Sequence, residues 1–329
     1  MKKVLNKLFE HQRLTREEAY ETLTEITRGE VNEAQIAAFL TVYLMRSISV
    51  EELDGFRQAL LDLCIRLDMS YAETIDLCGT GGDGKNTLNI STLASFVVAG
   101  AGGKVVKHGN YGVSSVCGSS NVLESLGYRF KNDETALRRE LDEAGICFLH
   151  APMFHPALKN VGPVRRALGV KTFFNMLGPL VNPAFPDCQL TGVFNLELQR
   201  IYGYLLQPTG RRFQVVHTLG GYDEISLTGA AKTVSNLGEK TLTPADFGGS
   251  VTETDISGGS TVEANAKLFT TILEGRGTAA QNRVVAANSA LALQCISPGK
   301  SLEECIAEAN ESLESGRALG ALKKLIELT

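Results

Sequence analysis

The feature that most constrains the fold is a βαβ unit between residues 73 and 107. Residues 73–77 alternate as a strand does, and the glycine-rich loop CGTGGDGKNTLNIS follows at 78–91. Residues 93–97 have helical spacing, and residues 104–107 predict the next strand. This order predicts an α/β domain with a central, mostly parallel sheet flanked by helices.

The first 68 residues predict helices only. Thr15 with Glu18 and Ser49 with Glu52 are capping boxes, and Asn32 can cap a helix between them. A helical stretch at about 156–182 is expected to pack back onto this small domain, while 73–155 and 183–329 form the α/β domain. Later strands are expected at 146–149, 214–218 and 270–273, and later helices at 132–144, 281–294 and 301–315.

Composition excludes several classes of protein. The 329 residues hold 37 acids against 32 Lys and Arg, and this acidic balance argues against nucleic acid as a partner. No apolar run is long enough to span a membrane, and charges interrupt the apolar residues at the start, unlike a signal peptide. The seven cysteines are scattered and never form C-x-x-C, which favours reduced thiols in the cytoplasm over disulfides or zinc.

The loop at 78–91 matches two phosphate-binding patterns imperfectly. A dinucleotide fingerprint needs a helix that begins inside the glycines and an acid about 20 residues later, and neither is present. A P-loop needs Ser or Thr after its lysine, but Asn86 follows Lys85. Simple tight turns remain an alternative. We interpret the loop as a third kind of anion site.

The surrounding charge supports that interpretation. Residues 84–123 contain no Asp or Glu, where about four or five would be expected from the whole chain. Glycine-freed backbone N–H groups and a helix beginning near Ser91 would attract phosphate. The density of hydroxyl and amide side chains suggests a ligand with two phosphate ends and a sugar between them. These side chains are Thr87, Asn89, Ser91, Thr92, Lys107, Asn110, Ser114, Ser115, Ser119 and Ser120.

Several motifs taken together resemble the anthranilate phosphoribosyltransferase family, nucleoside-phosphorylase-like enzymes of tryptophan synthesis. They are GTGGD (79–83), NIST (89–92), KHGN (107–110), VGPVRRALGVKTFFNMLGPLVNP (161–183) and YDEIS (222–226). They follow the order of the family over nearly the whole chain. The resemblance implies the substrates phosphoribosyl diphosphate and anthranilate, two Mg²⁺ ions per monomer, and a homodimer formed through the helical domain. It also implies a site in the cleft between the two domains.

The resemblance also implies roles for individual residues. Anthranilate would be held by Gly79, Asn110 and Arg165, and Mg²⁺ by Ser91, Asp223 and Glu224. His108 would line the entry, and no general base is evident. Phosphoribosyl diphosphate would be held by Gly79, Gly82, Asp83, Thr87, Asn89, Ile90, Ser91, Thr92, Lys107, His108, Gly109, Asn110, Ser114, Ser115 and Ser119.

Some of these roles have alternatives. By spacing alone Arg166 is as good an anion ligand as Arg165, and an Asp-Glu pair such as 223–224 is usually solvated surface. Relatives commonly place Arg and Ser after KHGN, whereas Tyr111 and Gly112 stand there. A pyrimidine nucleoside phosphorylase and a non-catalytic nucleic-acid-binding protein of the same fold are the rival functions.

Overall fold

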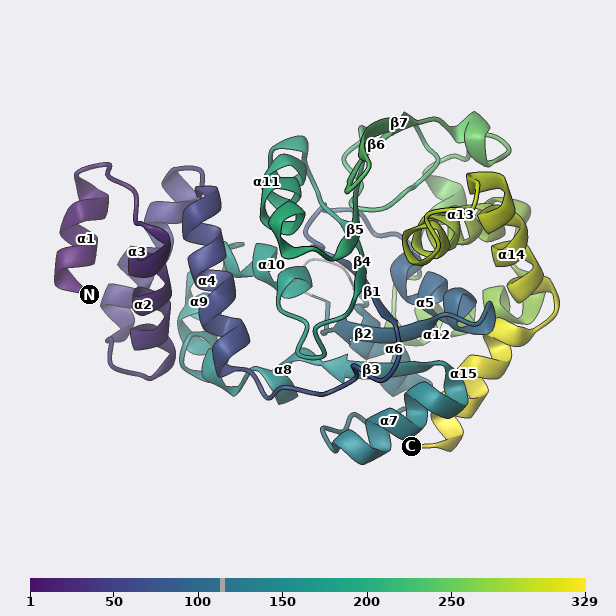
Figure 1. Cartoon of the computed structure of the whole chain (residues 1–329), viewed down its shortest axis with the longest axis horizontal. Coiled ribbons are helices and arrows are strands. Elements are labelled where there is room, and N and C mark those ends of the chain that lie inside the picture. The colour runs from purple at the N-terminus through teal and green to yellow at the C-terminus, as the bar shows by residue number, and fades with distance from the viewer. Residues whose placement is uncertain (113–115) are drawn as a thin grey trace. The chain divides into compact units, whose positions relative to one another are not determined.

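The computed structural model describes residues 1–112 and 116–329, and it divides them into two compact units. The first unit consists of Met1–Leu67 and Ala151–Pro183, and the second consists of Asp68–His150 and Ala184–Thr329 (Figure 1). Ser114 and Ser115, which were predicted to bind phosphoribosyl diphosphate, lie outside the described residues.

The first unit is a bundle of helices and short helical turns. Its elements are α1 (Lys2–Phe9), α2 (Arg16–Thr27), α3 (Glu33–Met45), α4 (Val50–Leu63), α8 (Ala151–Phe154), η1 (Pro156–Asn160), α9 (Gly162–Leu168), α10 (Phe174–Leu177) and η2 (Gly178–Leu180). Both predicted capping boxes are present at Thr15 and Ser49, and Asn32 caps α3. Each cap supplies an acceptor for N–H groups that the first helical turn leaves unpaired.

An aromatic cluster forms the centre of this bundle. Phe39 and Tyr43 from α3 and Phe56 from α4 meet Phe173, and the rings of Phe56 and Phe173 stack with centroids 4.6 Å apart. Phe174 stacks on Phe173 at the same distance, 4.6 Å. Burial of these large rings is the main force that holds residues 173–174 against α3 and α4.

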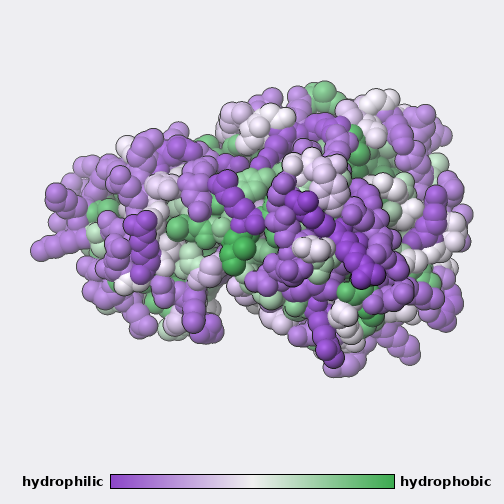
Figure 2. All heavy atoms as spheres, turned by 60° about the horizontal axis from the view of Figure 1, so that its bottom comes forward, coloured by the Kyte–Doolittle hydropathy of each residue, from purple (hydrophilic) through white to green (hydrophobic). Residues whose placement is uncertain are grey.

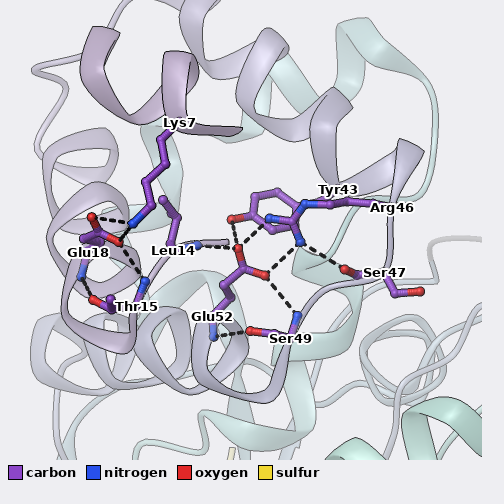
Figure 3. A network of polar contacts seen from close by, with 9 residues as sticks. All are labelled: Lys7, Leu14, Thr15, Glu18, Tyr43, Arg46, Ser47, Ser49 and Glu52. Carbon is purple, nitrogen blue, oxygen red and sulfur yellow. Dashed lines mark hydrogen bonds and ion pairs between the residues drawn. The ribbon is translucent and has the colours of Figure 1, made fainter. Parts of the chain in front are cut away.

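A buried carboxylate links three segments of the bundle (Figure 3). The fully buried Glu52 side chain accepts hydrogen bonds from the Leu14 backbone N–H at 3.0 Å, the Tyr43 hydroxyl at 3.1 Å and the Ser49 backbone N–H at 3.0 Å. Arg46 donates to both oxygens of Glu52 at 2.6 and 2.9 Å. The charge is therefore paired inside the bundle, which is the condition for burying a carboxylate at low cost.

The second unit is built on one seven-stranded sheet. Its order is β3-β2-β1-β4-β5-β6-β7, with the first five strands parallel and the last two antiparallel. The strands are β1 (Thr74–Gly79), β2 (Lys104–Gly109), β3 (Ile146–His150), β4 (Cys188–Gly192), β5 (Arg212–Thr218), β6 (Ala231–Ser235) and β7 (Gly238–Leu242). This arrangement confirms the predicted α/β fold with a mostly parallel sheet.

Helices cover this sheet, and Figure 1 shows α11 on the opposite side from α5 and α13. The helix α5 packs on β1 and β2, α13 packs on β4 and β5, and α11 packs on β5 and β6. The helical elements are α5 (Ile90–Gly100), α6 (Ser119–Ser125), α7 (Glu134–Ala144), α11 (Leu196–Leu206), η3 (Gln207–Thr209), η4 (Pro244–Phe247), η5 (Thr254–Ile256), α12 (Val262–Thr271), η6 (Ile272–Arg276), α13 (Ala279–Ile296), α14 (Leu302–Glu314) and α15 (Arg317–Glu327).

The strand predicted at residues 270–273 is wrong, because these residues end α12 and begin η6. Thr261 caps this helix, and the Thr270 hydroxyl donates back to the Ala266 carbonyl one turn earlier. Phe269 and Ile272 are buried together on its inner face. Helical packing thus overrides the strand preference of a short β-branched run.

The face of the molecule drawn in Figure 2 is largely hydrophilic, with smaller hydrophobic areas between charged side chains. Among the described residues, no helix is both long and apolar enough to cross a membrane. All seven cysteines are free thiols.

Candidate active site

The topology of the sheet marks one place for a ligand. From β1 the chain moves outward to β2 and β3, and from the neighbouring β4 it moves the other way to β5. Open α/β sheets bind ligands beyond the carboxyl ends of the strands at such a reversal. Gly79 and Gly192 are register partners at those ends of β1 and β4. The glycine-rich loop therefore begins at the predicted ligand edge.

Glycine is required at this edge because the chain after β5 comes very close. A Cβ on Gly192 would lie 1.4 Å from the Asp223 carbonyl oxygen, and a Cβ on Gly79 would lie 2.7 Å from Asp223 Oδ2. The two glycines thus let the segment that carries Asp223 reach the ends of β1 and β4. A small cavity at this point is lined by Gly79, Ser91, Gly192, Asp223, Glu224 and other residues of the same unit.

Buried polar side chains fix the segment around Asp223 and Glu224. The Thr218 hydroxyl at the end of β5 donates to the Glu224 carbonyl at 2.6 Å. Asn288 in α13 accepts from the Ile225 N–H at 3.0 Å and donates to the Ile225 carbonyl at 2.9 Å. Thr218, Gly192 and Asn288 were not among the predicted site residues. The only local signal for Asn288 is an amide within an alanine-rich helix.

The two carboxylates reach the glycine-rich loop and the start of α5. Asp223 Oδ2 accepts from the Gly81 N–H at 2.7 Å, and Glu224 Oε1 accepts from the Ser91 N–H at 2.8 Å. The helix N-terminus predicted at Ser91 is therefore present, and Glu224 is bound to one of its N–H groups. The pair is not solvated surface, since Asp223 is buried and Glu224 is half-buried.

This site concentrates negative charge away from water. Burial, and next the negative charge of Asp83, raise the pKa of Asp223 to about 7. Removal from water, and next the charge of Asp223, raise the pKa of Glu224 well above its ordinary value. The two backbone hydrogen bonds offset only part of this effect. A cation between these carboxylates would relieve their mutual repulsion.

These residues fit a magnesium site in which protein carboxylates and substrate phosphate oxygens together bind the ion. Within residues 1–112 and 116–329, no three His, Cys, Asp or Glu side chains form a complete metal-binding cluster. Magnesium commonly uses one or two carboxylates together with substrate phosphate oxygens rather than a cage of protein ligands alone. The adjoining Asp223 and Glu224, with Ser91 beside them, meet that description.

The glycine-rich loop is hydrogen-bonded to a segment that is distant in the sequence. The Leu88 N–H donates to the Ile256 carbonyl at 2.9 Å, and the Asn86 side chain donates to the Gly258 and Gly259 carbonyls. Asp83 Oδ1 accepts from the Lys85 N–H at 2.9 Å. This loop and the first turn of α5 contain eight of the residues predicted to bind phosphoribosyl diphosphate: Gly79, Gly82, Asp83, Thr87, Asn89, Ile90, Ser91 and Thr92. The side chains of Ile90 and Thr92 are buried.

Three more residues predicted to bind phosphoribosyl diphosphate, Lys107, His108 and Gly109, lie at the end of β2, and a fourth, Ser119, begins α6. Lys107 is buried and its Nζ donates to the Leu77 carbonyl. His108 is also buried, and its backbone N–H donates to Asp76 Oδ1 at 3.1 Å. Gly109 follows at the strand end, and Asn110 is exposed with its carbonyl accepting from Ser119 and Ser120.

Tyr111 stands where the family resemblance leads to the expectation of arginine. Its ring meets the His150 ring edge to face at 4.9 Å and lies 6.3 Å from the Phe130 ring, and its hydroxyl donates to Glu124 at 3.3 Å. The Gly112 N–H donates to Asn121 Oδ1 at 2.9 Å. An aromatic anchor thus stands in place of the expected cation.

Arg165 lies in the helical unit, and the structure distinguishes it from Arg166. The Arg165 side chain is half-buried, with Nη2 donating to Asn175 Oδ1 at 3.4 Å and the guanidinium 5.2 Å from the centre of the Phe174 ring. Burial lowers the pKa of the Arg165 guanidinium. Arg166 is exposed. Arg165 is therefore the better candidate to bind an anion out of bulk water.

Comparison with protein families defines the class. A glycosyl transferase model described as the helical bundle domain matches residues 2–64, and a second described as the a/b domain matches residues 71–319. The fold, with its bundle and its glycine-rich ligand edge, is thus that of a glycosyltransferase.

Known relatives narrow this class. An anthranilate phosphoribosyltransferase of Flavobacterium johnsoniae is 58% identical over the full length of both chains. The Thermus thermophilus anthranilate phosphoribosyltransferase structure is 35% identical, with a TM-score of 0.91 over 98% of each chain. The Saccharomyces cerevisiae enzyme in complex with PRPP and Mg is 27% identical, with a TM-score of 0.90 over 98% of this chain and 96% of the other. The chain belongs to the anthranilate phosphoribosyltransferase family.

Proposed function

We propose that this protein transfers the 5-phosphoribosyl group from phosphoribosyl diphosphate to the amine of anthranilate, a step of tryptophan biosynthesis. The products are N-(5-phosphoribosyl)anthranilate and diphosphate. One observation carries the proposal: Asp223 and Glu224 adjoin the glycine-rich loop at the carboxyl ends of β1 and β4. Neither a pyrimidine nucleoside phosphorylase nor a nucleic-acid-binding protein is favoured, since full-length relatives carry the transferase name.

The glycine-rich loop and the end of β2 are proposed to bind the donor. The loop residues Gly79, Gly82, Thr87, Asn89 and Ser91 are glycines or carry short polar side chains, which suit phosphate and ribose oxygens. Asp83 would accept from a ribose hydroxyl. Lys107 is proposed to assist donor binding, because its buried ammonium adds positive charge near Glu224.

Asp223, Glu224 and Ser91 are proposed to hold Mg²⁺, with two ions per monomer. When bound, Mg²⁺ neutralises charge on the diphosphate leaving group. The protein would keep the carboxylates in place through Thr218 and Asn288.

Arg165 is proposed to bind the carboxylate of anthranilate, and Asn110 its amine end. The ribosyl C1–O bond to diphosphate breaks as the C1–N bond to the amine forms, and the amine then releases a proton to solvent. An aromatic amine is unprotonated at neutral pH, so positioning without a general base is sufficient. His108, whose side chain is buried, would support the loop rather than transfer a proton.

Loss of anthranilate fluorescence tests the reaction directly, and the chain contains no Trp to add background. We expect loss only when both phosphoribosyl diphosphate and Mg²⁺ are present, and EDTA should abolish it. A folded protein that binds the donor but leaves the fluorescence unchanged would contradict the proposal. If His108→Ala abolished turnover without weakening either substrate, the account of positioning without a base would be wrong.

We also propose a homodimer in the cytoplasm, formed through the helical unit. Phe9 in α1 and Leu44 and Met45 in α3 are exposed, with Met45 83% exposed, and α1 packs against α3. Light scattering should give twice the 35.4 kDa chain mass. Met45→Glu with Phe9→Glu should halve that mass, and an unchanged mass would place the interface elsewhere.

A further inference from the structure

The guanidinium of Arg165 is paired with neutral groups. Among the described residues, no Asp or Glu lies within ion-pair distance of it, and its partners are the Asn175 amide oxygen and the Phe174 ring. A half-buried arginine normally pairs with a carboxylate, as Arg46 does with Glu52 in the same unit. The charge of Arg165 therefore remains available to a ligand.

Asn175 supplies the hydrogen bond that orients this guanidinium. Its Oδ1 accepts from Arg165 Nη2 at 3.4 Å and from the Thr172 backbone N–H at 3.1 Å, so one oxygen joins α9 to the turn before α10. An amide oxygen accepts as a carboxylate does but carries no net charge. Asn175 can thus fix the direction of the guanidinium without neutralising it.

Two neighbours support this arrangement. Phe174 lies under the guanidinium and is itself held by the stack with Phe173 and Phe56, which leaves little freedom for the cation to move. The Thr172 hydroxyl is buried, and it has no hydrogen-bond partner among the described residues. A buried polar group left without a partner is uncommon in a packed core and is more typical of a binding site.

We propose that Asn175 is a positioning residue that selects for an acceptor bearing a carboxylate, by orienting Arg165 while leaving its positive charge uncompensated. This inference rests on the proposed function and deepens it. A carboxylate at position 175 would occupy the guanidinium permanently and compete with the acceptor. Methyl anthranilate, which lacks the carboxylate, would gain nothing from Arg165 and is the matched probe.

Asn175→Asp is the decisive variant, because it keeps the shape of the side chain and the acceptor for Thr172. We expect the KM for anthranilate to rise by about tenfold or more, which is about 1.4 kcal/mol, with the KM for phosphoribosyl diphosphate changed less than twofold. Wild-type protein should prefer anthranilate over methyl anthranilate in kcat/KM, and the variant should lose most of this preference. Arg166→Ala, which alters the exposed neighbour, should leave all three quantities unchanged.

Asn175→Ala provides the second test, since it removes the acceptor without adding charge. Its KM for anthranilate should rise by less than that of Asn175→Asp. The proposal is overturned if Asn175→Asp keeps the wild-type preference between the two acceptors, or weakens both substrates equally. Wild-type protein that does not consume anthranilate would overturn the proposed function, and this inference with it.

Discussion

Glu52 in the helical unit and Asp223 in the α/β unit are both buried carboxylates, but their surroundings affect their charge in opposite ways. Burial alone would raise the pKa of Glu52, yet hydrogen bonds from Arg46 and from the Ser49 and Leu14 N–H groups lower it. Burial and neighbouring charge raise the pKa of Asp223, and no cationic side chain forms an ion pair with it among the described residues. A buried charge that is fully paired serves the fold, whereas one left partly unpaired indicates a ligand site.

The largest effect should come from removing charge at the ligand site. Asp223→Asn is expected to lower kcat/KM by about 10²- to 10³-fold, because the metal and the leaving diphosphate lose a charged ligand. The free energy of unfolding without ligands should stay equal or increase, since like-charge repulsion disappears. The rate of anthranilate fluorescence loss measures kcat/KM, and urea unfolding measures the free energy of unfolding. Loss of stability together with activity would make Asp223 a structural residue like Glu52.

The reverse result is expected in the helical unit. Glu52→Gln should lower the free energy of unfolding by about 3 kcal/mol, because Arg46 and two backbone N–H groups lose a charged acceptor. Activity per folded molecule should change less than twofold. Urea unfolding and fluorescence kinetics at low temperature check this, and stability within 1 kcal/mol of wild type would contradict it.

The pH dependence of stability gives a further test of how the helical unit treats buried ionisable groups, at His155. Burial lowers the pKa of this imidazole to about 4, although its Nε2 contacts the Val181 carbonyl at 2.9 Å. Below the ordinary value of about 6.5 the unfolded chain gains a proton that the folded chain does not, so stability falls between about pH 6.5 and 4. The loss should reach about 3 kcal/mol.

The control for that prediction is His155→Gln. Urea unfolding at several pH values should show the gap between wild type and variant narrowing as the pH falls through this range. A gap that is constant from pH 7 to 4 would show that His155 does not titrate differently in the folded and unfolded states. Glu52 adds a further loss at lower pH, since its lowered pKa gives stability that is present above about pH 4.3 and lost below it.

The smallest effect is expected at the edge of the ligand site. Tyr111→Phe keeps the ring contacts with His150 and Phe130 and removes only the exposed bond to Glu124, so stability should change by less than about 0.5 kcal/mol. Tyr111→Ala should cost about 1 kcal/mol by losing those contacts. Thermal unfolding distinguishes them. Equal effects from both variants would show that the hydroxyl, rather than the ring, anchors Tyr111.

Local signals in the sequence explain which parts could be predicted. Capping boxes at Thr15 and Ser49 specify helix starts through contacts only three residues apart, and both are present. The strands β4, β6 and β7 were not predicted, because each has only five residues and its pairing depends on neighbouring strands of the sheet. The strand at 270–273 was wrong because helical packing determines those residues.

In the candidate site, too, local motifs could be predicted from the sequence, whereas contacts between distant segments could not. The Asp-Glu pair and the glycine-rich loop are visible as motifs, but their contact depends on the close approach at Gly192 and on Asn288, about 65 residues further on. The prediction that Lys107 binds the donor stays a prediction, and the sequence did not indicate that its side chain is buried and donates to the Leu77 carbonyl. Such burial depends on tertiary contacts that residue spacing does not reveal.

The most direct test of the contrast between the units is stabilisation by ligands. Unfolding of wild type, Asp223→Asn and Glu52→Gln should be followed in urea with Mg²⁺, with phosphoribosyl diphosphate, and with both. We predict that both together raise the midpoint of wild type and of Glu52→Gln by similar amounts and leave Asp223→Asn almost unchanged. A full rise in Asp223→Asn would contradict the claim that the partly unpaired carboxylates form the binding site.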